Sequence, residues 1–567
     1  MNDIKFKNLF NKSDLRTIKW MYDICKSQKY KVLVLIIVES ISAIITVSFA
    51  KLSKDIINAA TIDKSFDLVI KNSLYFIFAI LIQLALYVLE RSTTERCRCR
   101  LEWILKQHML ESSIKKDYAS ISKYHTGELQ NRMFNDVSVI ADGFTTILPN
   151  IVYFVVKLIA AFAYLVIIDK IFAVIFLVGG MCVFLFTHLF RGVIKKMHKE
   201  VQETEGKTRS FIQEALTSLL VVKSFVVEDK IAEKADDLQS ENYRVKMKRR
   251  FFSISANAGI NLVFNIGFVF AVAFGAYRII FFNMSYGNVT AMIQLVSQIQ
   301  SPFASLSSVL PRYFTLLASA ERLMEIDDLP DEHHEDEGEI DVELAYDDLK
   351  SINFTDISFA YDRDIILDNT SLTVNKGDFV AIMGISGIGK STLLKLLLGV
   401  YRVDSGTIEL DLQDEAMPVG YVTRRMFSYV PQGNFILSGT IYDNLTFINE
   451  NVTDEEIAEA IRISCSDEFI STLPDGLETV IGERGVGLSE GQLQRLAIAR
   501  SLLSKAPIML LDEATSALDE ATEKRFLENL KELETKTCII VSHKKAALDI
   551  CNKHVQIIDS KIVTEEA

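Results

Sequence analysis

A glycine-rich stretch in the C-terminal part of the chain has the residue types of a loop that binds phosphate groups. Residues 384–392 read GISGIGKST. The apolar residues 379–383 before it predict a buried strand, and the leucine-rich sequence after it predicts a helix. In this context glycines let the backbone wrap around an anion, so that N–H groups and the helix N-terminus point at phosphate oxygens. The residues expected to contact a nucleotide here are Gly384, Ser386, Gly387, Gly389, Lys390, Ser391 and Thr392.

Two acidic residues at the end of a second apolar strand supply the groups that hydrolysis needs. Residues 508–511 are a continuous apolar run that ends in Asp512 and Glu513, and parallel sheets bind ligands at the carboxyl ends of their strands. We expect Ser391 and Asp512 to bind Mg²⁺ and Lys390 to neutralise the outer phosphates. Glu513 would polarise the water that attacks the terminal phosphate.

The sequence LSEGQ at residues 488–492 resembles the signature motif of ATP-binding cassette (ABC) transporters. With the motifs above, essentially the whole chain resembles an ABC exporter half-transporter, in which a transmembrane domain and a nucleotide-binding domain are fused. The resemblance implies that two cassettes enclose two ATP molecules. Ser489, Gly491 and Gln492 of one cassette would then face the terminal phosphate held by the other. Glu490 stands where the family most often has glycine, and we expect its side chain to point away from the phosphate.

The resemblance implies roles for four further residues in the ATP site. Tyr361 resembles the aromatic residue that stacks on adenine, although an ordinary core tyrosine is the alternative. Gln432 resembles the glutamine that contacts the metal and the attacking water. His543 resembles the histidine that contacts the terminal phosphate. Asp519 ends the sequence SALD, which resembles the loop that crosses to the opposite cassette.

Three other segments resemble the parts that connect a cassette to the membrane domain. Residues 126–130 and 214–225 are similar to the cytoplasmic loops whose coupling helices sit in cassette grooves. Residues 483–485 are similar to the short stretch that touches these loops. The resemblance therefore implies that nucleotide binding is transmitted to the membrane helices through these contacts.

The N-terminal half of the chain has the composition of a membrane domain. Hydrophobic residues make up 49% of the chain and charged residues 24%, which indicates an apolar part and a soluble part. Crossing a bilayer takes about 20 predominantly apolar residues in a helix. Six runs have this character: residues 32–50, 73–89, 149–168, 171–190, 260–282 and 289–310. Six such runs separated by charged segments predict six membrane spans rather than buried helices of a soluble protein.

The links between these runs predict the orientation in the membrane. Residues 169–170 and 283–288 are short links, expected to be turns on the outer face, whereas residues 90–148 and 191–259 are long, charged and helix-patterned. The long segments are too rich in Lys and Arg to be translocated easily. With the lysine-rich N-terminus, they predict an integral protein of the plasma membrane with both termini and the ATPase domain in the cytoplasm.

The domain boundaries follow from these patterns. We expect a cytoplasmic N-terminus with an amphipathic helix (1–31), an all-α six-helix transmembrane domain (32–326), an acidic linker (327–348) and an α/β P-loop nucleotide-binding domain (349–567). The linker holds twelve Asp and Glu residues and no Lys or Arg, so it carries nearly all of the net charge of −13. We interpret it, with His333 and His334, as solvated, and expect no nucleic-acid partner. The seven cysteines lack zinc-site spacing and are expected to be reduced thiols.

The resemblance implies an ATP-driven exporter subunit that moves an amphiphilic peptide, lipid or drug-like molecule from the cytoplasm or inner leaflet outward. A soluble cassette protein would lack the six spans, and an importer normally keeps its ATPase in a separate chain. Since one cassette lacks a partner's signature motif, we expect a second half-transporter, and an identical chain is the first choice. Two alternatives stay open: a heterodimeric exporter with one weakened ATP site, and a non-pumping channel or regulator on the same frame.

Polar residues within the predicted spans are the candidates for contact with the transported molecule. Glu39 lies in the first span, Lys157 in the third, and Gln294 and Gln298 form a polar stripe on the sixth. An intramembrane charge is rare and often functional, but a polar contact between helices is the alternative for each residue. The motifs themselves give no information on the substrate.

Overall fold

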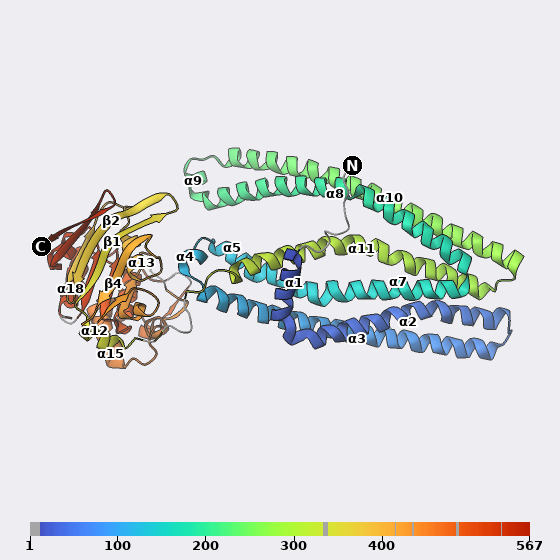
Figure 1. Cartoon of the computed structure of the whole chain (residues 1–567), viewed down its shortest axis with the longest axis horizontal. Helices are drawn as coiled ribbons and strands as arrows, with labels where there is room; N and C mark the ends of the chain where they lie inside the picture. The colour runs from blue at the N-terminus through green and yellow to red at the C-terminus, as the bar shows by residue number, and fades with distance from the viewer. Residues whose placement is uncertain are drawn as a thin grey trace. The chain divides into compact units, whose positions relative to one another are not determined.

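The structure is a computed structural model that describes residues 12–332, 338, 340–413, 415–433, 436–482, 487–533 and 536–566. It divides into two compact units (Figure 1). Unit 1 comprises Met1–Glu111 and Thr126–Asp327, and unit 2 comprises Ser112–His125 and Asp328–Ala567. The all-α and α/β classes predicted from the sequence are both confirmed.

Unit 1 is built almost entirely from long helices. Its described helices are α1 (Lys12–Cys25), α2 (Lys29–Thr61), most of α3 (Phe66–Lys115), α5 (Thr126–Asn131), α6 (Val137–Asp142), α7 (Leu148–Ile168), α8 (Lys170–Thr217), α9 (Leu219–Ser224), α10 (Glu228–Phe282) and α11 (Tyr286–Asp327). Two single π-helical turns, Arg132–Asp136 and Gly143–Ile147, flank α6. Helices α8 and α10 run side by side as a hairpin that α9 closes (Figure 1).

Four helical stretches of the described residues are long and apolar enough to cross a membrane. They are Asp14–Thr61, Phe66–Lys115, Thr126–Ile168 and Glu228–Phe282. These stretches contain the first, second, third and fifth predicted spans. The fourth and sixth predicted spans, residues 171–190 and 289–310, lie within α8 and α11. The apolar part of α8 that is described, Lys170–Gly180, is shorter than a full span. Six spans therefore remain a prediction.

The helices of unit 1 are joined by small apolar residues and by ion pairs, one of which involves the fully buried side chain of Asp169. Ala50, Ala161 and Ala291 are fully buried where α2, α7 and α11 meet, and small side chains let membrane helices approach closely. Asp169, in the short link between α7 and α8, caps α8 by accepting hydrogen bonds from two backbone N–H groups at its start. Asp169 Oδ2 also pairs with Arg278 Nη2 of α10 at 2.5 Å. This residue thus fixes the turn between two predicted spans.

Unit 2 contains two main sheets. A four-stranded antiparallel sheet has the order β2-β1-β4-β5, and a six-stranded sheet has the order β12-β11-β3-β10-β9-β6. In the larger sheet every pairing is parallel except that of β11 with β12. Its strands are β3 (Phe379–Met383), β6 (Phe427–Val430), β9 (Ile508–Asp512), β10 (Thr537–Val541), β11 (Lys553–Ile558) and β12 (Lys561–Glu566). The smaller sheet contains β1 (Ser351–Tyr361), β2 (Asp364–Asn375), β4 (Ser405–Asp411) and β5 (Ala416–Pro418).

The register of the parallel strands aligns the segments that carry the motifs. Val541 pairs with Ile382 of β3 on one side and with Asp512 of β9 on the other. The carboxyl ends of β3, β9 and β10 therefore meet at one edge of the sheet. Apolar side chains of these strands are fully buried against α13 (Lys390–Leu397) and against α17 (Glu490–Leu503) and α18 (Glu520–Lys531). This core makes the edge a rigid platform for the loops.

The acidic segment is only partly the solvated linker that its composition suggested. Residues 342–348 form α12 (Val342–Asp348), which Asp341 caps by accepting from the N–H groups of the first turn. Tyr346 is buried in the core of unit 2, and its hydroxyl lies 3.0 Å from Thr537 Oγ1 of β10. A linker prediction based on charge misses this helix because its apolar anchor is a single short stretch. His333 and His334 lie outside the described residues.

A short segment between α3 and α5 belongs to unit 2. Its helix α4 (Tyr118–Ile121) is capped by Asp117, which accepts from Ser120 N at 3.0 Å. The ring of Tyr118 meets Tyr401 edge to face with centroids 5.7 Å apart. Lys116 Nζ pairs with Asp331 at 2.7 Å. Residues 126–130, which resemble a cassette-contacting loop in sequence, begin α5 in unit 1, and their contact with a cassette stays a prediction.

Candidate ATP site

The glycine-rich loop forms a cradle between β3 and α13. Gly389 has a φ of +116°, a conformation that favours glycine, and a Cβ at this position would overlap Ile366. Lys390 is the first residue of α13 and is only 5% exposed. Its Nζ donates to the carbonyl oxygens of Gly384 at 2.8 Å and Ile385 at 3.1 Å. The loop therefore holds a buried ammonium group at a helix N-terminus, an arrangement that suits phosphate oxygens.

Asp512 and Ser391 lie together as the expected metal ligands require. Ser391 Oγ donates to Asp512 Oδ1 at 3.0 Å. The Asp512 residue is 1% exposed, and this burial raises the pKa of its carboxyl group above the usual value. A cation at this point would stabilise the charged form, and a hydroxyl with a carboxylate are hard oxygen ligands of the kind Mg²⁺ prefers. The residues present thus fit a magnesium ion.

Glu513 and Gln432 meet although they come from loops after different strands. Gln432 Nε2 donates to Glu513 Oε2 at 2.7 Å. Glu513 has a φ of +52°, which is uncommon for a residue with a side chain, and its N–H donates to Val541 O at 3.2 Å. Strained backbone of this kind is often found at functional sites. One oxygen of the glutamate is thus fixed, while Gln432 keeps its own side-chain oxygen for a further contact.

His543 lies at the same edge of the sheet, two residues after the end of β10. Its side chain is exposed. The next residue, Lys544, was not predicted from the sequence, yet its Nζ donates to the carbonyl oxygens of Thr515 at 2.7 Å and Leu518 at 2.9 Å. Lys544 also pairs with the buried Glu523 at 3.2 Å. The loop that carries the sequence SALD is therefore tied to the segment that carries His543.

Tyr361 belongs to an aromatic cluster beside the loop. Its ring meets Phe359 and Tyr401 edge to face, with centroids 4.9 and 5.3 Å apart. The hydroxyl accepts from Thr392 Oγ1 at 3.4 Å. Tyr361 therefore packs against neighbouring rings as a core residue would. The residue is only half-buried, so it stays partly accessible. Both readings of this residue from the sequence, core tyrosine and adenine platform, agree with this environment.

The signature motif forms the start of α17. Ser489 caps the helix, and its side chain and that of Gln492 each bond the other's backbone N–H. A Cβ on Gly491 would lie 2.8 Å from the Ala517 carbonyl oxygen, so this close approach requires glycine. Gln494, which the sequence analysis did not single out, fixes the same loop: its side chain donates to Ser516 Oγ and accepts from Ala517 N, both at 2.9 Å.

A surface pocket of about 390 Å³ opens where α17 meets this loop. The lining residues are Ser489, Glu490, Gly491, Arg495, Ala517, Leu518 and Asp519. Glu490 is exposed and lines the pocket, so the departure from the usual glycine falls within it. Asp519 caps α18 by accepting from Thr522 N and Thr522 Oγ1, and these bonds lower the pKa of its carboxyl group. Residues 483–485 lie outside the described part of the chain.

Three of the four polar residues predicted for a substrate cavity make contacts between helices. Lys157 Nζ of α7 donates to Ser301 Oγ of α11 at 3.0 Å. Gln294 and Gln298 of α11 both donate to α2, Gln294 to Ser53 Oγ at 3.2 Å and Gln298 to the Thr46 carbonyl at 3.0 Å. The fourth, Glu39 of α2, is half-buried. These contacts support the helix-contact alternative for the two glutamines.

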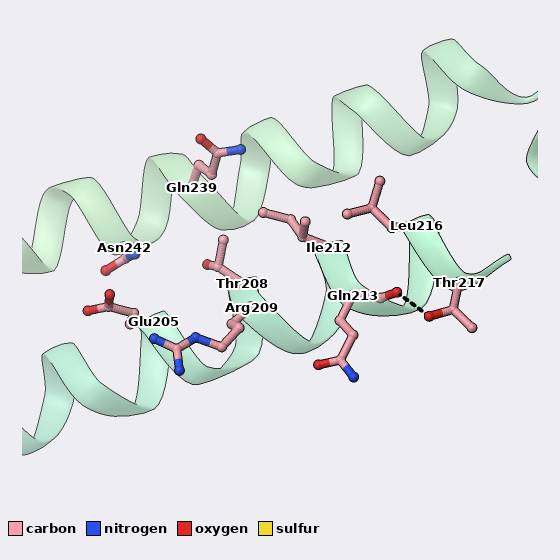
Figure 2. Close-up of a pocket in the computed structure, with 9 residues that line it drawn as sticks. All are labelled: Glu205, Thr208, Arg209, Ile212, Gln213, Leu216, Thr217, Gln239 and Asn242. Carbon is pink, nitrogen blue, oxygen red and sulfur yellow. Dashed lines mark hydrogen bonds between the residues drawn. The ribbon is translucent and has the colours of Figure 1, made fainter. Parts of the chain in front are cut away.

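A larger groove of about 690 Å³ lies between α8 and α10 (Figure 2). Its lining residues are Glu205, Thr208, Arg209, Ile212, Gln213, Leu216, Thr217, Gln239 and Asn242. None of the four predicted cavity residues is among them. Both helices contribute to its walls (Figure 2).

The fold and site define a class: a nucleotide-binding α/β domain with cassette motifs, preceded by a helical domain with apolar stretches of membrane length. Comparison with known proteins gives the same result. The ABC transporter transmembrane region family matches residues 32–303, and the ABC transporter ATPase family matches residues 367–516. The chain belongs to the ABC transporters, and among them to the exporters that carry both parts in one chain.

The relatives agree with this assignment. A Rickettsia felis protein named as an export ATP-binding/permease protein is 35% identical over 378 residues, which cover 65% of this chain and 63% of that protein, less than two thirds of its length. Staphylococcus aureus proteins named as multidrug export ATP-binding/permease proteins are 29% identical over 86% of this chain and 85% of their own. A solved bacterial Atm1-family ABC exporter with ATP bound has the same fold, with a TM-score of 0.81, 22% identity and 95% of each chain covered.

Proposed function

We propose that this protein is one subunit of a homodimeric, ATP-driven exporter of amphiphilic molecules. The observation that carries the proposal is the 2.7 Å hydrogen bond between Gln432 and Glu513, beside the contact of Ser391 with Asp512. A non-pumping channel or regulator would not need a carboxylate fixed at the phosphate-facing edge of the sheet. The fusion of this domain to helices of membrane length supports coupling of hydrolysis to transport.

In the proposed mechanism, ATP binds with its phosphates in the loop of residues 384–392. Lys390 and the N-terminus of α13 stabilise the outer phosphates. Ser391, Asp512 and Gln432 would hold Mg²⁺, which would neutralise negative charge on the phosphate oxygens. Because Gln432 occupies one oxygen of Glu513, the other oxygen can accept a hydrogen bond from the attacking water. His543 contacts the terminal phosphate.

The proposed dimer completes each site with the signature motif of the second chain. Ser489 and Gly491 border a pocket on the surface of the cassette, and the helix N-terminus beside them favours an anion. ATP would close the two cassettes, and hydrolysis would reopen them. The closure would reach the membrane helices through α4 and through the exposed apolar tip of the α8–α10 hairpin, which includes Leu220, Phe225 and Val226.

Transport from the cytoplasmic side tests this proposal. Inside-out vesicles that contain the chain would be offered a panel of fluorescent lipids, peptides and amphiphilic dyes with Mg²⁺ and ATP. We expect ATP-dependent uptake of at least one class, and no uptake by vesicles that carry Glu513→Gln at the same protein density. Uptake that persists in the Glu513→Gln vesicles would contradict ATP-driven export. ATP hydrolysis that appears only with a second, related chain would indicate the heterodimeric alternative.

A further inference from the structure

Tyr429 contacts the proposed metal site although none of the cassette motifs described above includes it. It is the third residue of β6, and its hydroxyl donates to Asp512 Oδ2 at 3.1 Å. The other oxygen of the same carboxylate, Oδ1, accepts from Ser391 Oγ at 3.0 Å. Both oxygens of Asp512 are therefore held by donors, one from β6 and one from α13.

The strand register explains how Tyr429 reaches this carboxylate. Tyr429 pairs with Leu510 in the parallel ladder between β6 and β9. Asp512 is two residues beyond Leu510, so the two side chains lie on the same face of the sheet, about 6.6 Å apart along the strand direction. The side chain of Tyr429 is long enough to span this distance, so its hydroxyl reaches the Asp512 carboxylate. The ring itself packs against the apolar core of unit 2, which limits the positions that the hydroxyl can adopt.

The Tyr429 hydroxyl is the donor in its bond with Asp512, because an ionised carboxylate oxygen can only accept. Oδ2 of Asp512 therefore accepts from Tyr429. The other oxygen, Oδ1, lies on the side of the phosphate-binding loop, where it accepts from Ser391.

We propose that Tyr429 is a positioning residue for the metal site, whose hydroxyl orients the Asp512 carboxylate so that Oδ1 is presented to Mg²⁺. The inference rests on the proposed function, because it takes Ser391 and Asp512 as the metal ligands. The proposed role of Tyr429 is to affect metal binding, and not the binding of the adenine or of the phosphates. Residues that orient a metal ligand in this way typically change metal affinity about 10- to 100-fold when they are replaced.

Tyr429→Phe is the informative variant because it removes the hydroxyl and keeps the ring in the core. The experiment uses the full chain in lipid nanodiscs with Glu513→Gln in the background, so that ATP is not consumed. Mn²⁺ binding in the presence of ATP is followed by electron paramagnetic resonance, and ATP binding without metal is measured in EDTA. We expect Mn²⁺ to bind about 10-fold or more weakly in Tyr429→Phe, with metal-free ATP binding unchanged.

Two further variants separate the possible outcomes. Tyr442→Phe removes a hydroxyl from a partly exposed tyrosine of α14 (Ile441–Thr446) and should behave as the background protein. Asp512→Asn should weaken Mn²⁺ binding at least as much as Tyr429→Phe. If Asp512→Asn leaves Mn²⁺ binding unchanged, the proposed metal site fails and the role of Tyr429 with it. If Asp512→Asn acts but Tyr429→Phe does not, or if Tyr429→Phe weakens metal-free ATP binding equally, only the positioning role is overturned.

Discussion

Glu513 is the residue on which the proposed hydrolysis depends most directly. Its left-handed backbone conformation and its bond to Gln432 place the carboxylate at the end of β9, next to the buried Asp512. Uncommon backbone conformations are often found at functional sites, which supports the proposed catalytic role of Glu513.

Replacing Glu513 with Gln should abolish turnover without preventing nucleotide binding. The amide has nearly the same shape but cannot accept a proton from the attacking water. We expect the ATPase rate to fall on the order of 10²-fold or more, with ATP still bound. The matched control is Glu528→Gln, an exposed carboxylate on α18. A Glu513→Gln rate within a few-fold of the original would rule out the assigned role.

The residues that sequence motifs reveal are those with a characteristic neighbourhood along the chain. Lys390, Ser391 and Asp512 could be predicted because each follows a recognisable strand or loop. Tyr429, Gln494 and Lys544 could not, although each contacts a motif residue or the loop beside one. Their contacts depend on the strand order of the parallel sheet and on two loops meeting in space, and neither is encoded by local spacing.

Among the elements, α4, in the segment between α3 and α5, contacts an aromatic residue of the nucleotide-binding unit. Tyr118 meets Tyr401, which in turn meets Tyr361 next to the phosphate-binding loop. Aromatic pairs of this kind contribute about 0.5–1.5 kcal/mol beyond the area that they bury. The contact is therefore strong enough to hold α4 in place and weak enough to change during a transport cycle.

Tyr118→Ala should separate transport from hydrolysis. The substitution removes the ring that anchors α4 and leaves the cluster around Tyr361 intact. We expect basal ATPase activity within about two-fold of the original and a clear loss of stimulation by a transported substrate, since the pair contributes only about 1 kcal/mol. Parallel measurements of both activities in nanodiscs check this. Equal loss of both would instead show that α4 is needed for the ATP site itself.

Two charged residues in α2 and α7 are predicted to contact the transported molecule. Glu39→Ala and Lys157→Met each remove a charge from a predicted span, and we expect each to lower transport and substrate-stimulated ATPase several-fold, as is typical for functional intramembrane charges. Ser301→Ala is the control for Lys157, because it removes the hydrogen-bond partner in α11 and leaves the charge of Lys157 in place. If Lys157→Met and Ser301→Ala have the same effect, the lysine serves helix packing and not the substrate.

The elements themselves were largely predictable, and the errors have physical causes. The strands at residues 379–383 and 508–511 follow from their apolar runs, and both form as expected. The helix α12 was missed because Tyr346 and Ala345 are the only buried residues in a run dominated by carboxylates. The contact of α4 with Tyr401 was not predicted, since a four-residue helix has no periodicity to detect, and the loop contact at residues 126–130 stays a prediction.

At the scale of the whole molecule, each proposed ATP site needs two chains. The phosphate-binding loop and the signature motif both lie in unit 2, and in the proposed dimer each signature motif serves the loop of the other chain. Glu490 lines the signature pocket, so a homodimer would carry this carboxylate in both sites. In a heterodimer, the Glu490 carboxylate would be present in only one of the two ATP sites.

Complementation between two inactive variants tests the shared sites. Lys390→Ala disables the phosphate-binding loop, and Gly491→Ala places a Cβ against the Ala517 carbonyl. Each variant alone should be inactive. When both are co-expressed with different tags and the mixed dimer is isolated, one of its two sites has an intact loop and an intact signature motif. We expect the mixed dimer to recover up to about half of the original ATPase activity, whereas sites confined to one chain would give no recovery.

The most direct test of the account is the mass and ATPase activity of the purified chain in lipid nanodiscs, with no second transporter chain present. The account predicts a particle that contains two copies of the chain and hydrolyses ATP in a Mg²⁺-dependent reaction that Glu513→Gln abolishes. A single-copy particle without activity, which becomes active only when a second, related chain is added, would contradict the homodimer.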